Sequence, residues 1–161
     1  MKLFLSILAI LVVLTGQPAQ AKPNIILILV DDMTVPMLKN MPNVKQYILD
    51  EGVTFTNSVT DFALCCPYRA SLFTGLAAHN HGIKDHDAPG GWEGFRSFES
   101  NTLPLWLQDA GYKTAMIGKY VNRYDGSVVP PGWNEWFAFV PHGYFNYDLT
   151  DNGVLVHYGT D

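Results

Sequence analysis

One apolar run near the start of the chain constrains the fold more than any other feature. It covers residues 24–30, contains no charged side chain and is rich in β-branched residues. Such runs are typical of strands that are buried on both faces, as in the sheets of α/β proteins. The run ends at Asp31 and Asp32. Since α/β folds place their functional sites at the carboxyl ends of such strands, the sequence predicts an α/β fold with an acidic pair at that edge.

Local signals predict three further elements in the first half of the chain. Residues 43–49 have helical spacing, and residues 53–59 alternate apolar and polar side chains as a strand does. A helix is expected to open at Cys65, because Pro67 suits a first helical turn and Gly75 suits a helix end. Cys65 would then lie at a helix N-terminus, whose partial positive charge favours an anion.

The second half of the chain is predicted to hold a helix, a strand and a hairpin. Residues 79–94 are polar and glycine-rich and are expected to form a surface loop. Thr102 is expected to cap a helix that ends before Gly111, and residues 112–117 are expected to form a strand. The next segment is rich in aromatic residues, proline and glycine, and we assign it no regular structure. Residues 144–158 are expected to form a hairpin around a tight turn.

The first 21 residues have the features of an export signal. Lys2 precedes an apolar stretch at residues 3–14, and Ala19 and Ala21 form a small-residue cleavage site. The stretch is short for a membrane span, so no stable membrane anchor is expected after cleavage. The sequence therefore predicts a signal peptide at residues 1–21 and a mature chain at residues 22–161. It would be exported to the periplasm or the exterior, or to the lysosome in a eukaryote.

Charge argues against one class of partner. Loss of Lys2 with the signal leaves nine basic and 15 acidic residues, a net charge of −6. No cluster of basic residues is present, so nucleic-acid binding is not expected.

The two cysteines of the chain are adjacent and belong to an unusual motif. Cys65, Pro67 and Arg69 are spaced as Cys-x-Pro-x-Arg, and Thr74-Gly75 follows after a short apolar stretch. A bridge between neighbouring cysteines is strained, although an intermolecular disulfide stays open as an alternative. The motif resembles the signature of the sulfatases, in which the first cysteine is oxidised to formylglycine by a formylglycine-generating enzyme.

A second segment strengthens this resemblance. Residues 111–120 open with Gly-Tyr and end with Gly-Lys-Tyr, and they look like the second sulfatase signature. Membership implies an alkaline-phosphatase-like fold, with a mostly parallel or mixed sheet flanked by helices. It also implies sulfuric ester hydrolysis, with Cys65, Arg69 and Lys119 as catalytic residues. The family's metal is Ca²⁺, with Mg²⁺ possible, and the ligands would be Asp31, Asp32 and the modified Cys65.

The motifs also point to a branch of the family. Cys65-Cys66-Pro67 resembles the N-acetylglucosamine-6-sulfatases, as does the segment 119–122, Lys-Tyr-Val-Asn. This resemblance implies a sulfated carbohydrate substrate such as N-acetylglucosamine-6-sulfate, and it makes Asn122 a candidate substrate contact. Tyr68 departs from the pattern, because serine is more usual at this position.

Length is the largest departure from the family. Sulfatase domains are several times longer, so we expect the N-terminal part of such a domain, with further metal ligands downstream and an incomplete sheet. Asp151 and Asn152 imitate a ligand pair but follow Lys119 too soon, and are expected to form a turn. Two alternatives stay open: a truncated, non-catalytic protein that binds sulfated glycans, and a phosphatase or phosphodiesterase of the same superfamily.

Overall fold

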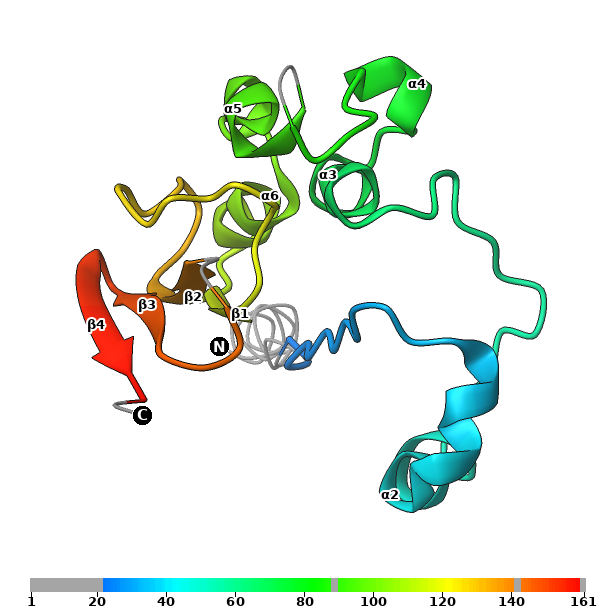
Figure 1. The fold of residues 1–161 in the computed structure, drawn as a ribbon. Helices are drawn as coiled ribbons and strands as arrows, with labels where there is room; N and C mark the ends of the chain where they lie inside the picture. The colour runs from blue at the N-terminus through cyan, green and yellow to red at the C-terminus, as the bar shows by residue number, and fades with distance from the viewer. Residues whose placement is uncertain (1–21, 88–89, 141–142, 160–161) are drawn as a thin grey trace, which may run out of the picture. The chain divides into compact units, whose positions relative to one another are not determined.

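The computed structural model describes residues 22–87, 90–140 and 143–159 of the chain (Figure 1). Contacts divide it into two units, one ending at Val30 and the other running from Asp31 to Asp161. The second unit contains all of the described helices and strands. The helical elements are η1 (Val35–Asn40), α2 (Pro42–Val44), η2 (Lys45–Leu49), α3 (Cys65–Thr74), α4 (Ala78–His81), α5 (Gly91–Phe95), η3 (Arg96–Phe98) and α6 (Leu103–Asp109). The strands are β1 (Ala115–Gly118), β2 (Glu135–Val140), β3 (Tyr147–Asp151) and β4 (Val154–Tyr158).

The strands form one mixed sheet in the order β1-β2-β3-β4. β1 and β2 are parallel, whereas β2, β3 and β4 pair antiparallel. The turn between β3 and β4 is made by Asn152 (φ 47°) and Gly153 (φ 88°), two residue types that tolerate the left-handed region. The predicted α/β class with a mixed sheet flanked by helices is therefore confirmed, as is the hairpin.

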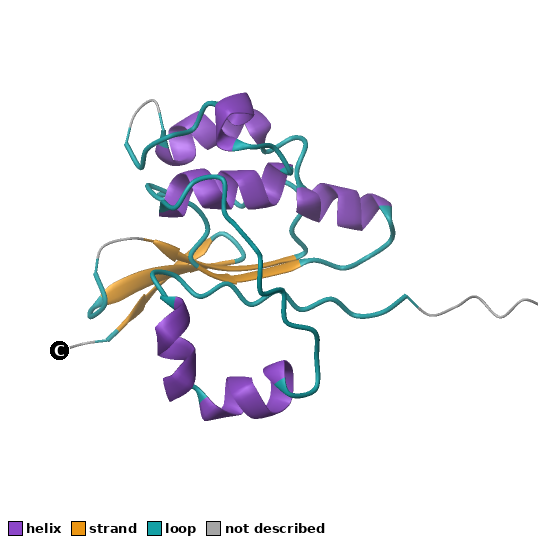
Figure 2. Ribbon diagram, turned by 90° about the vertical axis from the view of Figure 1, so that its right-hand side faces the viewer, coloured by secondary structure: helices purple, strands orange, loops and turns teal. Residues whose placement is uncertain are grey.

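The core lies between one face of this sheet and the helices that cover it (Figure 2). Alternate residues of β2 are buried, and Trp136, the largest of them, packs edge-on against Tyr120 with ring centroids 5.0 Å apart. Tyr120 also contacts Phe73 of α3 and Phe95 of α5. The loop that follows β1 thus carries a central core residue, which fixes the position of its neighbour, Lys119.

The helix predicted at Cys65 is present, and it ends as the sequence indicates. Gly75 adopts the left-handed conformation at φ 67°, and its N–H bonds to the carbonyl of Ser71. The predicted helix after Thr102 is also present as α6. Thr102 does not cap it through its side chain, because its hydroxyl contacts the carbonyl of Glu99 instead.

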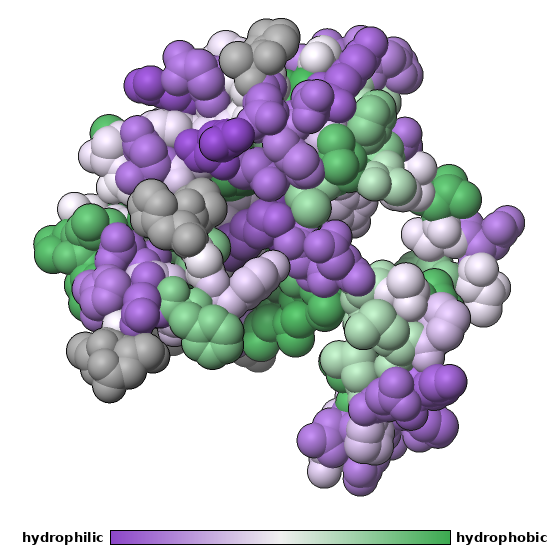
Figure 3. Space-filling model, viewed as in Figure 1, coloured by the Kyte–Doolittle hydropathy of each residue, from purple (hydrophilic) through white to green (hydrophobic). Residues whose placement is uncertain are grey.

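The predicted helix at residues 43–49 appears as α2 followed by the π-type turn η2. No residue of η1, α2 or η2 is buried. This segment lies at lower right in Figure 3, where hydrophobic residues, in green, reach the surface. Its exposed apolar side chains include Val35, Met37, Tyr47 and Ile48.

Two strand predictions are wrong for this structure. Residues 24–30 and 53–59 form no strand, and their apolar side chains are largely exposed, with Ile26 at 85% and Val59 at 90%. A strand needs a hydrogen-bonded neighbour as well as a suitable side-chain pattern. Among the described residues, no strand pairs with either segment.

Two other segments were predicted to lack regular structure but contain it. Residues 79–94 contain the short helices α4 and α5, and Trp92 and His81 are buried rather than exposed on a loop. The aromatic segment after the second motif contains β2, a central strand of the sheet. In both cases large aromatic side chains gain enough from burial to order backbone that local propensity leaves unassigned.

The segment assigned to a signal peptide, residues 1–21, lies outside the described residues. Within the described part of the chain, no helix has the length and apolarity that a membrane crossing requires.

Candidate functional site

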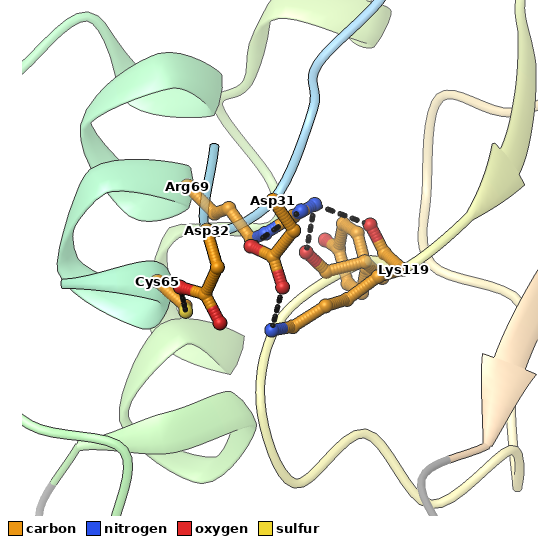
Figure 4. Close-up of polar contacts among 6 residues, drawn as sticks. Asp31, Asp32, Cys65, Arg69 and Lys119 are labelled. Atoms are coloured by element: carbon orange, nitrogen blue, oxygen red, sulfur yellow. Dashed lines mark hydrogen bonds and ion pairs between the residues drawn. The ribbon is translucent and has the colours of Figure 1, made fainter. Parts of the chain in front are cut away.

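Three separated segments bring charged side chains together in the second unit (Figure 4). Asp31 and Asp32 precede the first helical turn, Cys65 and Arg69 lie on the first turns of α3, and Lys119 follows β1. Gly118 has φ 103°, a conformation that favours glycine, and it begins the loop that carries Lys119. All five predicted catalytic and metal-binding residues therefore meet in one place.

Asp31 is the centre of this cluster. Its Oδ2 atom lies 2.6 Å from Nζ of Lys119, and its Oδ1 atom lies 3.3 Å from Nη2 of Arg69. Partial burial would raise the pKa of Asp31, but hydrogen bonds and charges from Lys119 and Arg69 outweigh it and hold the pKa below its usual value. Asp31 therefore stays ionised in the folded protein over the whole neutral range.

Arg69 is almost fully buried, with 5% of the residue exposed. Its Nη1 atom donates to the backbone carbonyls of Lys119 and Tyr120. The guanidinium thus joins α3 to both Asp31 and the loop after β1.

Asp32 and Cys65 complete the cluster beside Asp31 (Figure 4). Asp32 has φ 54°, which is unfavourable for a residue with a side chain and is found where surrounding structure imposes it, often at functional sites. The Sγ atom of Cys65 lies 3.9 Å from Oδ1 of Asp32. One ligand atom from each of Asp31, Asp32 and Cys65 falls within 4.8 Å of the others.

This donor set suits the predicted metal in part. Two carboxylates are the hard oxygen ligands that Ca²⁺ and Mg²⁺ prefer, whereas a thiol is not. Conversion of Cys65 to an oxygen-bearing side chain would make all three donors hard. The residues present therefore fit a divalent cation best after that modification.

The two cysteines have different surroundings. Cys65 is the first residue of α3 and is partly exposed, whereas Cys66 is fully buried and burial raises the pKa of its thiol. Neither forms a disulfide. Only Cys65 lies beside the acidic pair, so the structure distinguishes the two positions.

Asn122 lies on the same loop as Lys119, three residues further on. Its backbone carbonyl accepts a hydrogen bond from the N–H of Trp92 at 2.7 Å. Its side-chain oxygen is buried and has no hydrogen-bond partner among the described residues. The side-chain oxygen of Asn122 therefore makes no hydrogen bond to the five clustered residues.

Sequence reasoning missed a buried carboxylate next to this loop. One oxygen of Glu99 accepts hydrogen bonds from the indole N–H of Trp92 and the hydroxyl of Tyr120. In the sequence Tyr120 is the aromatic residue of a motif, and no spacing pattern links Glu99 to it.

A second network that the sequence did not reveal supports the segment before Cys65. Asp61 accepts hydrogen bonds from the hydroxyl of Ser71 and the backbone N–H of Ala78, and Nε2 of His81 lies 3.0 Å from the Ser71 oxygen. Nδ1 of His81 accepts the N–H of Ile83, so Nε2 carries the proton and donates. His81 therefore cannot take a proton from Ser71. The network of Asp61, Ser71 and His81 is structural.

Comparison with known proteins places this site in a family. A family model described as Sulfatase matches residues 23–153. The chain belongs to the sulfatase family. The matched range includes every residue of the five-membered cluster.

Individual relatives agree with this assignment. The extracellular sulfatase SULF-1 homolog of Drosophila melanogaster is 38% identical over 148 residues, which cover 88% of this chain and 13% of that protein. Human N-acetylglucosamine-6-sulfatase is 34% identical over 153 residues, which cover 86% of this chain and 27% of that enzyme. This sulfatase-family chain thus spans between 13% and 27% of the length of these relatives.

A solved structure supports the fold. It is a complex of a protein with its substrate, D-glucosamine-2-N,6-O-disulfate, and it matches with a TM-score of 0.51 at 26% sequence identity. The match covers 75% of this chain and 22% of the other. The mixed sheet and its helices therefore correspond to part of a larger domain in that neighbour.

Proposed function

We propose that the protein hydrolyses sulfate esters of sugars and uses a formylglycine formed from Cys65. The observation that carries this proposal is the cluster itself, in which Cys65 lies beside Asp32 while Lys119 and Arg69 contact Asp31. A sulfate ester is an anion that gains charge on its oxygens during hydrolysis, and cationic groups fixed in advance stabilise that charge.

The chemistry requires an aldehyde hydrate at Cys65, not a thiol. One hydroxyl of the hydrate loses its proton and attacks sulfur. The bond between sulfur and the sugar oxygen breaks, and that oxygen takes up a proton, so the sugar leaves as an alcohol. The second hydroxyl then loses its proton, the carbonyl re-forms and sulfate leaves. Addition of water restores the hydrate, so the cycle consumes one water for each ester.

The surrounding residues have separate roles in this proposal. Asp31 and Asp32 would hold a Ca²⁺ or Mg²⁺ ion together with an oxygen of the modified Cys65, and the ion would polarise sulfate oxygens. Lys119, which is partly exposed, is placed to neutralise one sulfate oxygen. Arg69 is buried and holds Asp31 in position, so its contribution is mainly the alignment of a carboxylate.

The substrate proposal rests on likeness to one branch of the family. Relatives at 34% identity are N-acetylglucosamine-6-sulfatases, and the structural neighbour is a complex with a 6-O-sulfated glucosamine. We infer N-acetylglucosamine-6-sulfate or a related sulfated sugar, with Asn122 as a candidate contact. The extracellular relatives and the predicted signal peptide favour export, with Cys65 modified by a formylglycine-generating enzyme.

Peptide mass spectrometry tests the modification directly. After co-expression with a formylglycine-generating enzyme, we expect a mass loss of about 18 Da at position 65, because a thiol is replaced by an aldehyde. Only Cys65 has Pro67 two positions and Arg69 four positions downstream. A loss mapped to Cys66, or no loss at either cysteine, would contradict the proposal.

An activity assay then tests the reaction and the substrate. The complete gene product, converted at Cys65, should release sulfate from N-acetylglucosamine-6-sulfate faster than from 4-nitrophenyl sulfate. Cys65→Ala should abolish turnover, and the matched change Cys66→Ala should leave it measurable. Preference for the aryl ester would refute the substrate, and release of phosphate but not sulfate from matched esters would refute the reaction class.

A further inference from the structure

Glu99 is a buried acid whose partners all lie close to the candidate site. Its residue exposure is 8%, and a single oxygen, Oε1, lies 2.8 Å from Nε1 of Trp92 and 3.2 Å from the hydroxyl of Tyr120. Arg96 lies over the Trp92 ring at 4.9 Å from its centroid. The carboxylate therefore joins α5 to the loop after β1.

Both partners of Glu99 are attached to the loop 119–122. Tyr120 directly follows Lys119, and the backbone carbonyls of these two residues accept hydrogen bonds from Arg69. Trp92 donates its backbone N–H to the carbonyl of Asn122. The loop is thus held from both ends by residues that share one carboxylate oxygen.

We propose that Glu99 is a positioning residue for the sulfatase site. It holds Tyr120 and Trp92 at a fixed separation, so that the carbonyls of residues 119 and 120 meet the guanidinium of Arg69. The same restraint holds Lys119 within reach of Asp31. The catalytic part of this inference rests on the proposed function, whereas the positioning of Arg69 does not.

A carboxylate suits this task better than the aromatic packing around it. Rings that contact edge-on restrict the tilt of Tyr120 but permit sliding, whereas two hydrogen bonds to one oxygen fix the distance between their donors. Burial of the acid also disfavours its charged form, since desolvation raises the pKa of Glu99 above its usual value. Because burial disfavours the charge of Glu99, we assign its carboxylate a role in alignment of the loop rather than in stability of the fold.

Two variants of Glu99 and a matched control test the proposal. Glu99→Gln keeps an oxygen that accepts both hydrogen bonds, whereas Glu99→Leu removes it. Glu93→Leu is the control, because Glu93 lies nearby on α5, its side chain is 79% exposed, and its carboxylate is 3.7 Å from Arg96. The first readout is hydrogen exchange of the Arg69 Nη protons by NMR, and the second is kcat and KM of the converted enzyme.

We expect Glu99→Leu to speed exchange of the Arg69 protons at least tenfold and to lower kcat by about 10- to 100-fold with KM little changed, as a misplaced group does. Glu99→Gln should restore both values to within about threefold of the wild type, and Glu93→Leu should change neither. Unchanged exchange and kcat in a folded Glu99→Leu protein would overturn the proposal.

Two further outcomes are also decisive. If Glu99→Leu does not fold, Tyr120→Phe replaces it, because this change removes one of the two hydrogen bonds and keeps the ring. Faster exchange of the Arg69 protons in Tyr120→Phe would support the inference, and unchanged exchange would refute it. If the wild-type protein hydrolyses no sulfate ester, the proposed function fails, and the Arg69 exchange rates alone decide whether Glu99 positions the loop.

Discussion

Replacement of Arg69 by methionine should destabilise the fold far more than the same change at Arg123. Both arginines pair with an aspartate, but their surroundings differ. Arg69 is buried and donates to two backbone carbonyls as well as to Asp31. The Arg123 side chain is 69% exposed, and its partner Asp87 is 62% exposed.

The magnitude follows from these contacts. Hydrogen bonds that involve a charged group contribute about 1.5–3 kcal/mol each when they are lost from a buried site. Simple addition overestimates the loss at Arg69, because Met retains the packing of the stem and Asp31 keeps its bond to Lys119. We therefore expect about 3 kcal/mol for Arg69→Met, against about 0–1 kcal/mol for Arg123→Met, as measured for exposed ion pairs.

Urea unfolding measures the difference in free energy of unfolding between the two variants. In thermal unfolding of a chain of this size, about 3 kcal/mol corresponds to a fall in Tm of roughly 10 °C. The loss at Arg123 should also shrink in ~1 M salt, where exposed charges are screened, whereas the loss at Arg69 should persist. Free energies of unfolding for the two variants that agree within about 0.5 kcal/mol would refute the view of Arg69 as a buried link between α3 and the loop.

Three further changes test the same electrostatic and backbone reasoning. The lowered pKa of Asp31 stabilises the folded wild type above about pH 4, and this stability is lost as pH falls through that pKa. Asp31→Asn should lack this contribution, so its free energy of unfolding, measured against pH, should not show that loss. The raised pKa of Glu99 in the wild type means that ionisation of this acid opposes folding as pH rises above about 4.5. Because Glu99→Gln cannot ionise, its free energy of unfolding relative to the wild type should increase from pH 4 to pH 7 in denaturant titrations. Asn152→Ala should lower Tm more than Asn152→Gly, because both lose the side-chain bond to the N–H of Trp136 but only alanine is strained at φ 47°.

Local patterns predicted those elements whose signals lie within a few residues. Gly75 marks the end of α3, and Asn152-Gly153 marks the hairpin turn, because these positions need left-handed backbone. The resemblance to the sulfatases predicted that Asp31 and Lys119 belong to one site, and the structure brings them together. The rule that sites gather where strands end accounts for Lys119, which follows β1, but not for Asp31, because the run before it forms no strand.

Features that depend on contacts between distant segments could not be predicted. β2 lies in a segment rich in proline and glycine, and it is recognisable only because Trp136 packs against Tyr120. Glu99 resembles any surface acid in sequence, and its burial depends on donors 7 and 21 residues away. Such partners are set by tertiary packing, which overrides the local pattern.

The electrostatics of the cluster explain why its residues stay together. Sequence motifs direct attention to Cys65, yet the residue with the most charged partners is Asp31, which lies between Lys119 and Arg69. Each oxygen of the Asp31 carboxylate accepts one of these cations and retains a further lone pair. Because Arg69 is buried, loss of Asp31 would leave its charge largely uncompensated, and it would also release Lys119. Asp31 therefore couples the charged groups of Arg69 and Lys119, which are also joined through the Lys119 carbonyl. Changes at Arg69 and Lys119 should not be energetically independent.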